Sequence, residues 1–202
     1  MQNELVSASE HYDRLIEEEN DPFRDPPALR AYMDGWDGAA FIEAMALTAV
    51  CDVLEIGVGT GRLAARVAPH CRRFVGIDLS PLTVTRAREN LEGQGNVTLI
   101  CGDFLTEAFF ESFDVIYSSL TFMHIEDTVG AIAKAAALLR KNGRFILSID
   151  KEREEFLDFG TRRVRLYPDE PQAVRRAIAT AGLVLAGTLE APHAYIFVAK
   201  FK

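Results

Sequence analysis

Three carboxylates and one glycine-rich turn are the features of this 202-residue sequence whose types and spacing could do chemistry. Glu55 lies in an apolar run that leads into the turn GVGTG at 57–61, and Asp78 and Asp103 each end a later apolar run. Such a turn lets the backbone approach a ligand at a helix N-terminus, where free N–H groups favour a carboxylate or phosphate. The ends of parallel strands share one crevice, so we expect the three acids to line one site.

The glycine spacing and the acids together indicate the charge of the ligand. The dinucleotide fingerprint GxGxxG needs its third glycine at position 62, where this sequence has Arg62, and this argues against NAD. Asp78 follows Gly57 by about 20 residues, a separation at which a carboxylate accepts ribose hydroxyls in either kind of nucleotide site. Glu55 and Asp103 would repel a pyrophosphate and attract an ammonium or a sulfonium. The residues therefore predict a positively charged adenosine derivative.

Four segments, in order, resemble the class I S-adenosylmethionine-dependent methyltransferases over roughly residues 50–150, with weaker similarity to the end of the chain. The segments are LEIGVGTGRL, GIDLS, GDF and FDVIYSSLTFMHIED. The resemblance implies a Rossmann-like domain with S-adenosyl-L-methionine as cofactor and S-adenosyl-L-homocysteine as product. It also implies which residues surround each part of the cofactor.

By this resemblance, the methionine part is surrounded by Glu55, Gly57, Gly59 and Gly61. Asp78 binds the ribose, and Asp103 with Phe104 binds the adenine. Leu79 and Ser119, from the second and fourth segments, complete the predicted cofactor site. From the residues alone, two alternatives stay open: Glu55 caps the glycine turn, and Phe104 belongs to the ordinary core.

His124, just after the predicted strand at 113–118, is the candidate for a catalytic base. Methyl transfer from a sulfonium displaces an already activated group, so alignment of donor and acceptor supplies much of the rate and no metal is required. A base matters only where the acceptor loses a proton, and the imidazole pKa suits that transfer. The alternative is a histidine that lines the cofactor pocket structurally. The other histidines, His11, His70 and His193, do not have a position comparable to that of His124.

Strands and helices alternate along the part of the chain that carries these residues. Short runs rich in Val, Ile and Phe, typical of strands buried on both faces, occur at 51–57, 73–78, 96–101, 113–118 and 143–150. Strand, helix, strand in repetition predicts a doubly wound α/β fold with a mostly parallel seven-stranded sheet. The runs at 183–190 and 194–202 are too close together for a parallel crossover, so we expect a C-terminal antiparallel hairpin.

Capping residues predict where the helices begin and end. Ser80 before Pro81 begins one helix, and Asp127 caps a second, whose buried stripe is Val129, Ile132, Ala136 and Leu139 and which Gly143 follows. A third helix begins near Pro171, buries Val174, Ala177, Ile178 and Ala181, and ends at Gly182.

Residues 1–50 do not follow this alternation, and we expect a short helical cap and lid over a Rossmann-like domain at 51–202. Helical spacing connects Leu5, Tyr12, Leu15 and Ile16 before the breaker DPFRDPP at 21–27, and a second helix is predicted from Phe41, Ile42, Met45 and Ala46. The cap and residues 151–168 should form the acceptor pocket. Either Tyr12, Tyr32 and Trp36 close over the ligands, or they only pack within the cap.

The charge distribution bears on partners. The chain has 22 basic and 30 acidic residues, a net charge of −8, and eight of the acids fall within residues 1–25. A continuous basic surface for nucleic acid is therefore not expected, and the acidic segment is interpreted as a solvated helix face rather than a docking surface. Arg162, Arg163 and Arg165 suggest an acidic small acceptor, although a solvated basic strand explains them equally well.

The cysteines and the lack of targeting patterns bear on the location of the protein. The three cysteines form no CxxC pair, and the sequence shows no signal-peptide or membrane-span pattern, so we predict a cytoplasmic location.

These observations predict a methyltransferase that uses S-adenosylmethionine to methylate a small molecule, with no membrane partner and an unassigned oligomeric state. Two alternatives stay open. One is an NAD(P)-dependent oxidoreductase, and the other is a protein that binds S-adenosylmethionine without turnover.

Overall fold

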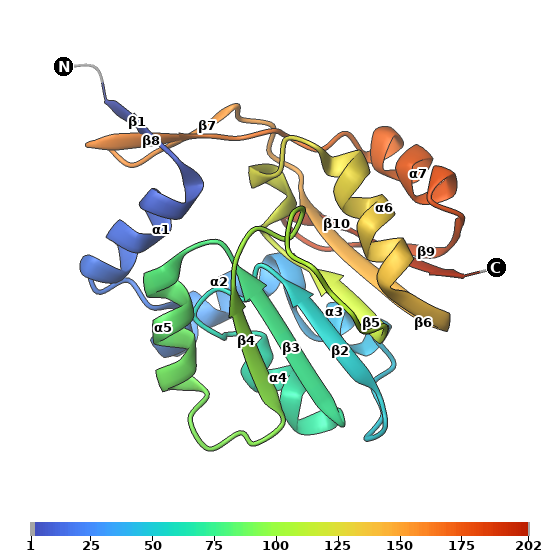
Figure 1. Ribbon diagram of the computed structural model, residues 1–202. Coiled ribbons are helices and arrows are strands. Elements are labelled where there is room, and N and C mark those ends of the chain that lie inside the picture. The colour runs from blue at the N-terminus through green and yellow to red at the C-terminus, as the bar shows by residue number, and fades with distance from the viewer. Residues whose placement is uncertain (1–2, 202) are drawn as a thin grey trace.

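A seven-stranded sheet forms the centre of the protein, and the computed structural model describes residues 3–201 (Figure 1). In spatial order the strands are β4 (Val97–Cys101), β3 (Arg73–Asp78), β2 (Asp52–Ile56), β5 (Phe113–Ser118), β6 (Leu139–Asp150), β10 (Ala194–Phe201) and β9 (Leu183–Glu190). Neighbours from β4 to β6 are parallel, whereas β10 is antiparallel to both β6 and β9. This confirms the predicted doubly wound fold and its C-terminal hairpin. The strand order reverses between β2 and β5, the point at which such sheets bind ligands.

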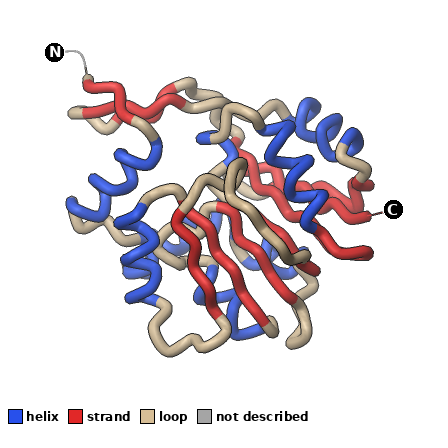
Figure 2. Tube along the Cα trace, viewed as in Figure 1, coloured by secondary structure: helices blue, strands red, loops and turns tan. Residues whose placement is uncertain are grey.

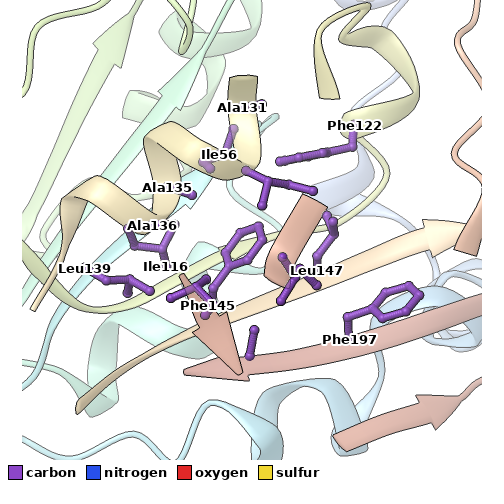
Figure 3. Close-up of a cluster of buried hydrophobic side chains, with 14 of the residues drawn as sticks. Ile56, Ile116, Phe122, Ala131, Ala135, Ala136, Leu139, Phe145, Leu147 and Phe197 are labelled. Atoms are coloured by element: carbon purple, nitrogen blue, oxygen red, sulfur yellow. The ribbon is translucent and has the colours of Figure 1, made fainter. Parts of the chain in front are cut away.

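Helices cover both faces of the sheet (Figure 2). They are α1 (Ala8–Glu17), α2 (Pro27–Asp37), α3 (Ala39–Ala44), α4 (Ala64–Val67), α5 (Pro81–Asn90), α6 (Thr128–Leu138) and α7 (Pro171–Thr180), with short 3-10 turns at Pro22–Arg24, Ala68–His70 and Phe122–His124. One apolar cluster joins α3 and α4 to the sheet, and a second, drawn in part in Figure 3, joins α6 and α7 to the opposite face. Burial on both faces is the reason that the central strands read as nearly continuous apolar runs.

The helix starts follow the capping residues. Ser80 Oγ accepts a hydrogen bond from the backbone N–H three residues later and begins α5, and Asp127 Oδ1 does the same for α6. The third predicted helix is α7, which begins at Pro171, and Gly182 follows it with a φ of +82°. Such a positive φ favours glycine, because it has no Cβ to clash with the backbone.

The predictions for the end of α6 and for one residue of its buried stripe were wrong. The helix ends at Leu138, because β6 begins at Leu139, which is paired with Phe113 of β5. Gly143 therefore lies within a strand and not just beyond a helix. Val129, expected on the buried stripe, is 57% exposed.

A second sheet joins the N-terminal segment to the part of the chain that follows β6. β1 (Glu4–Val6) pairs in parallel with β8 (Arg162–Arg165), which is antiparallel to β7 (Phe156–Asp158). In Figure 1 this small sheet lies above α1 at the upper left. Leu5, expected in a helix, is thus in a strand, because pairing with β8 supplies hydrogen bonds that local spacing could not reveal.

The helices of the N-terminal segment differ in part from those expected. Tyr12, Leu15 and Ile16 lie in α1, as predicted. The second predicted helix is α3, which ends before Met45 and Ala46, while α2 was not expected at all.

Two acidic side chains, Asp13 and Asp21, dock the N-terminal segment onto the rest of the protein, whereas the acids at 10 and 17–19 are exposed, in agreement with the interpretation of a solvated helix face. Asp13 Oδ1 on α1 accepts a hydrogen bond from Ser80 Oγ at 2.6 Å. Asp21 is 7% exposed, and its two carboxylate oxygens lie 3.1 and 3.2 Å from Asn90 Nδ2 on α5. Charge-assisted hydrogen bonds of this kind are about twice as strong as neutral ones, so the acids contribute to holding the segment in place.

Replacing Phe145 with alanine should destabilise the fold strongly. Its ring is fully buried in β6 at the centre of the sheet, so Phe145→Ala should lower the free energy of unfolding by about 3–5 kcal/mol. Phe110→Ala is the matched control, because Phe110 is 96% exposed, and its effect should stay within about 0.5 kcal/mol. Urea unfolding of both variants measures the difference, and equal effects would contradict the assigned core.

Candidate active site

A cavity of about 710 Å³ lies at the carboxyl ends of β2, β3, β4 and β5. Glu55, Asp78 and Asp103 all line it, so the structure brings together the three acids that the sequence singled out. Tyr12 of α1 and Met33 of α2 line it from the N-terminal segment. The cavity therefore lies between the sheet edge and the cap.

The glycine turn after β2 presents one open position to this cavity. Gly57, Gly59 and Gly61 have φ angles of +80°, +55° and +92°. A Cβ on Gly57 would overlap Thr121, and one on Gly61 would lie 2.9 Å from Leu91 Cδ1. Within residues 3–201 no atom lies within 4 Å of a Cβ built on Gly59, which lines the cavity with Gly57. Gly61 is not part of the lining, so its structural requirement is close packing.

Asp78 connects the glycine turn to the start of α5. Its Oδ2 accepts a hydrogen bond from Gly59 N at 2.9 Å, and its Oδ1 accepts one from Ser80 N at 3.0 Å. Burial raises the pKa of Asp78 above its ordinary value, although these backbone N–H groups act in the opposite direction. The neighbouring Leu79 lines the cavity and is 47% exposed, so it presents an apolar surface there.

Asp103 and Phe104 form the wall beyond β4. Asp103 is exposed, and its Oδ1 accepts a hydrogen bond from Leu105 N at 2.8 Å. Phe104 is only 5% exposed and belongs to an apolar core cluster while also lining the cavity. Lys134 Nζ lies 5.2 Å from the centre of its ring. The core and ligand-contact interpretations of Phe104 are therefore compatible.

Glu55 is buried beneath the turn and does not cap it. The side chain is 2% exposed, and Tyr117 Oη donates a hydrogen bond to Glu55 Oε2 at 2.8 Å. Burial raises the pKa of Glu55 well above its ordinary value, although the Tyr117 hydroxyl and the charge of Arg62 lower it. A cation that enters the cavity would favour the ionised form of this carboxyl.

Arg62, directly after the glycine turn, is largely buried. Its side chain is 14% exposed, and its Nη1 and Nη2 donate hydrogen bonds to the two oxygens of Asp37 at 2.9 and 2.6 Å. Asp37, the last residue of α2, is fully buried and also accepts a hydrogen bond from Ser119 Oγ at 2.7 Å. Arg62 and Ser119 both line the cavity, so this network joins the cap to its wall.

His124 lines the cavity and contacts the cap through Tyr12. Tyr12 Oη lies 2.9 Å from His124 Nε2. His124 Nδ1 is buried and has no hydrogen-bond partner among residues 3–201. Burial, together with the charge of His11, lowers the pKa of His124 to about 4, so the imidazole is neutral at neutral pH. Burial also raises the pKa of Tyr12, which keeps its hydroxyl protonated.

Large parts of the chain are similar to known proteins. Residues 54–147 match a family model described as a methyltransferase domain. An uncharacterized methyltransferase of Bacillus mycoides (strain KBAB4) is 37% identical over 99 residues, which are 48% of this chain and 46% of that protein. One of Geobacillus kaustophilus (strain HTA426) is 32% identical over 143 residues, 69% of this chain and 62% of that protein. Residues 54–147 therefore belong to the methyltransferase domain family.

Solved structures show the same fold. The magnesium protoporphyrin IX methyltransferase of Synechocystis PCC 6803, crystallised with S-adenosylmethionine, aligns with a TM-score of 0.74 at 18% identity over 96% of this chain and 95% of that one. The chain spans about half the length of several curated relatives that it matches, 46% in the case of the Bacillus mycoides protein.

Two of the three arginines of β8 make close contacts with other side chains of the protein, whereas the third, Arg165, is exposed. Arg162 is 3% exposed, and its Nη1 and Nη2 donate to the carboxylate of Glu18 at 2.6 and 2.8 Å. Arg163 stacks on Phe156, with its guanidinium carbon 3.7 Å from the ring centre. Arg162 is thus not a solvated strand residue, and its ion pair with Glu18 fastens α1 to β8.

Sequence reasoning missed three residues of the site or left their roles open. Tyr12 lines the cavity, whereas Tyr32 and Trp36 do not, and Trp36 Nε1 donates instead to Asp150 at 3.1 Å. Asp37 had no signal, because its helix was not predicted. Arg62 did have a signal in the sequence. It stands directly after the glycine turn, at the position where the dinucleotide fingerprint has a glycine, so it must lie beside the turn.

The buried His124 should make the protein less stable at mildly acidic pH. Its pKa of about 4 lies below the ordinary 6.5, so the unfolded state binds more protons and stability falls as the pH drops from 6.5 toward 4. His124→Asn should reduce the decrease in urea midpoint between pH 7 and pH 5. The control His70→Asn alters an exposed residue and should leave that decrease unchanged. An unaltered decrease in His124→Asn would contradict the buried, neutral imidazole.

Proposed function

We propose that this protein transfers a methyl group from S-adenosylmethionine to a small-molecule acceptor. The observation that carries the proposal is the single cavity shared by the open side of Gly59, the carboxylate of Asp78 and the carboxylate of Asp103. When bound, S-adenosylmethionine supplies a methyl group that is already activated on a sulfonium. The protein then has to hold donor and acceptor in line and exclude water.

The residues on the cavity wall fit the parts of this cofactor. Gly59 leaves its backbone open for the close approach of the methionine part, and Asp78 lies where it would accept hydrogen bonds from the ribose hydroxyls. Leu79 and Phe104 offer apolar surface for the adenine, with Asp103 beside them. Ser119 lines the same wall and hydrogen-bonds Asp37.

The charges on this wall disfavour the dinucleotide alternative. Asp78 and Asp103 lie around the glycine turn, the buried Glu55 would join them as a charge when a cation holds it ionised, and the nearby cation, Arg62, is paired with Asp37. A pyrophosphate at the turn would lie close to these carboxylates without a free cation to offset them, whereas a sulfonium and an ammonium would be attracted.

His124 is the proposed base for an acceptor that loses a proton. In the tautomer whose Nε2–H donates to Tyr12 Oη, the lone pair of Nδ1 is free to accept that proton. The low pKa keeps the imidazole in the neutral form from which a base acts, and it also makes His124 a weaker base than an ordinary histidine, whose pKa lies closer to neutral pH. Tyr12 acts as a positioning residue, because its hydroxyl fixes the ring from the cap.

A small acceptor is supported by the way in which the cap and the segment after β8 limit the cavity. Tyr12, Met33 and Tyr167 line the cavity from segments outside the large sheet.

Over the part of the chain that the structure describes, no helix combines the length and apolar character needed to cross a bilayer. The cytoplasmic location stays a prediction.

Binding of S-adenosylhomocysteine tests the proposed cofactor. At one hundred times its Kd this ligand should add about 2.7 kcal/mol to stability, visible as a rise in Tm, whereas NAD at the same concentration should add none. Asp78→Asn should remove most of the rise, because the uncharged amide is a poorer acceptor for the ribose hydroxyls. Stabilisation by NAD alone would contradict the proposal.

Turnover tests the role of His124. With radiolabelled S-adenosylmethionine and a small-molecule extract, His124→Asn should reduce methyl transfer by about 10²- to 10⁴-fold if the acceptor loses a proton at the histidine. Tyr12→Phe, which removes only the hydroxyl, should cause a smaller loss. Both variants should bind S-adenosylhomocysteine with nearly the wild-type Kd. Wild-type turnover in His124→Asn would contradict the role of His124 as a base, while the proposal of methyl transfer itself would stand.

A further inference from the structure

We propose that Arg62 binds the carboxylate at the amino-acid end of the cofactor, and that Asp37 of the cap positions Arg62 for this contact. The inference rests on the proposed function and deepens it, because it makes a residue of the N-terminal segment part of the cofactor site. It begins from the network of Arg62, Asp37 and Ser119 at the cavity wall.

The guanidinium of Arg62 has donors to spare. A guanidinium carries five N–H groups, and the hydrogen bonds that Arg62 makes within residues 3–201 use one on Nη1 and one on Nη2, both directed to Asp37. Arg62 lines the cavity next to the glycine turn. Its remaining donors form an edge that a carboxylate can engage at the place where the methionine part would lie.

Asp37 fixes that edge. It lies on α2, is fully buried, and holds the guanidinium with two short hydrogen bonds, while Ser119 Oγ donates to the same carboxylate. An arginine side chain loses considerable rotamer freedom when it is ordered, so a partner that orders it beforehand reduces the cost of binding. A buried aspartate also needs a counter-ion, which makes the pair persistent.

The charges around the pair match both groups of an amino acid. Arg62 offers N–H donors to the α-carboxylate, and the buried Glu55 on the same wall offers a carboxyl to the α-ammonium. Because Asp37 balances the charge of Arg62, the subsite favours a zwitterion over a bare anion. This differs from a phosphate site, which would have an unbalanced positive charge.

A second ion pair between the same two segments supplies a matched control. Arg66 Nη1 lies 2.7 Å from Asp34 Oδ1, so that α4 and α2 are joined again close to Arg62 and Asp37. The side chains of this second pair are 37% and 44% exposed, and neither residue lines the cavity. Breaking it alters cap docking without altering the proposed subsite.

Two ligands that differ only at the amino-acid end test the inference. S-adenosylhomocysteine carries the amino acid, whereas 5′-methylthioadenosine has the same adenosine and thioether without it. Calorimetry should find that Asp37→Asn and Arg62→Met weaken S-adenosylhomocysteine binding by about 10- to 100-fold, the range expected for hydrogen bonds to charged groups, while 5′-methylthioadenosine changes by less than about threefold. Arg66→Met should leave both Kd values nearly unchanged.

Arg62→Lys is a second variant in case the loss of charge disturbs folding. It keeps the charge and removes the planar fork, so it should also weaken S-adenosylhomocysteine selectively. Equal weakening of both ligands by Asp37→Asn and Arg62→Lys, or unchanged binding of both, would overturn the inference. Wild-type protein that binds neither ligand would overturn the proposed function itself, so the two failures are distinguishable.

Discussion

The burial of carboxylates at the carboxyl edge of the parallel sheet is the constraint on which the rest of the structure depends. An unpaired charge is costly away from water, so each buried acid needs a specific partner. Glu55 has the Tyr117 hydroxyl, Asp78 has two backbone N–H groups, and Asp37 has the guanidinium of Arg62. These partners come from β5, from the glycine turn with Arg62 after it, and from the start of α5, while Asp37 itself comes from the cap, so satisfying the acids also fixes the shape of the cavity.

The same requirement connects the N-terminal segment to the site. Asp13 and Asp21 hold this segment against α5, and Glu18 holds α1 against β8 through Arg162. The cap is therefore attached around the cavity by charged contacts rather than by apolar packing alone.

Local patterns predicted those features that depend on neighbours in the sequence. The strand runs, the N-caps Ser80 and Asp127, and the hairpin after β9 were all visible, because capping and alternation act over a few residues. The pairing of β1 with β8 was not visible, since its partners lie far apart in the chain. The helix α2 was missed for a related reason: packing against the sheet, and not a strong local pattern, stabilises it.

The sequence by itself determined that three acids and a glycine turn would meet at one edge, because parallel strands place their carboxyl ends together whatever the details of packing. Only the tertiary structure decided which side chains complete that edge. Tyr12 meets His124 across 112 positions of the chain and Arg62 meets Asp37 across 25, contacts that no spacing rule encodes. They form because burial of each polar group selects the partner that the folded chain brings within reach.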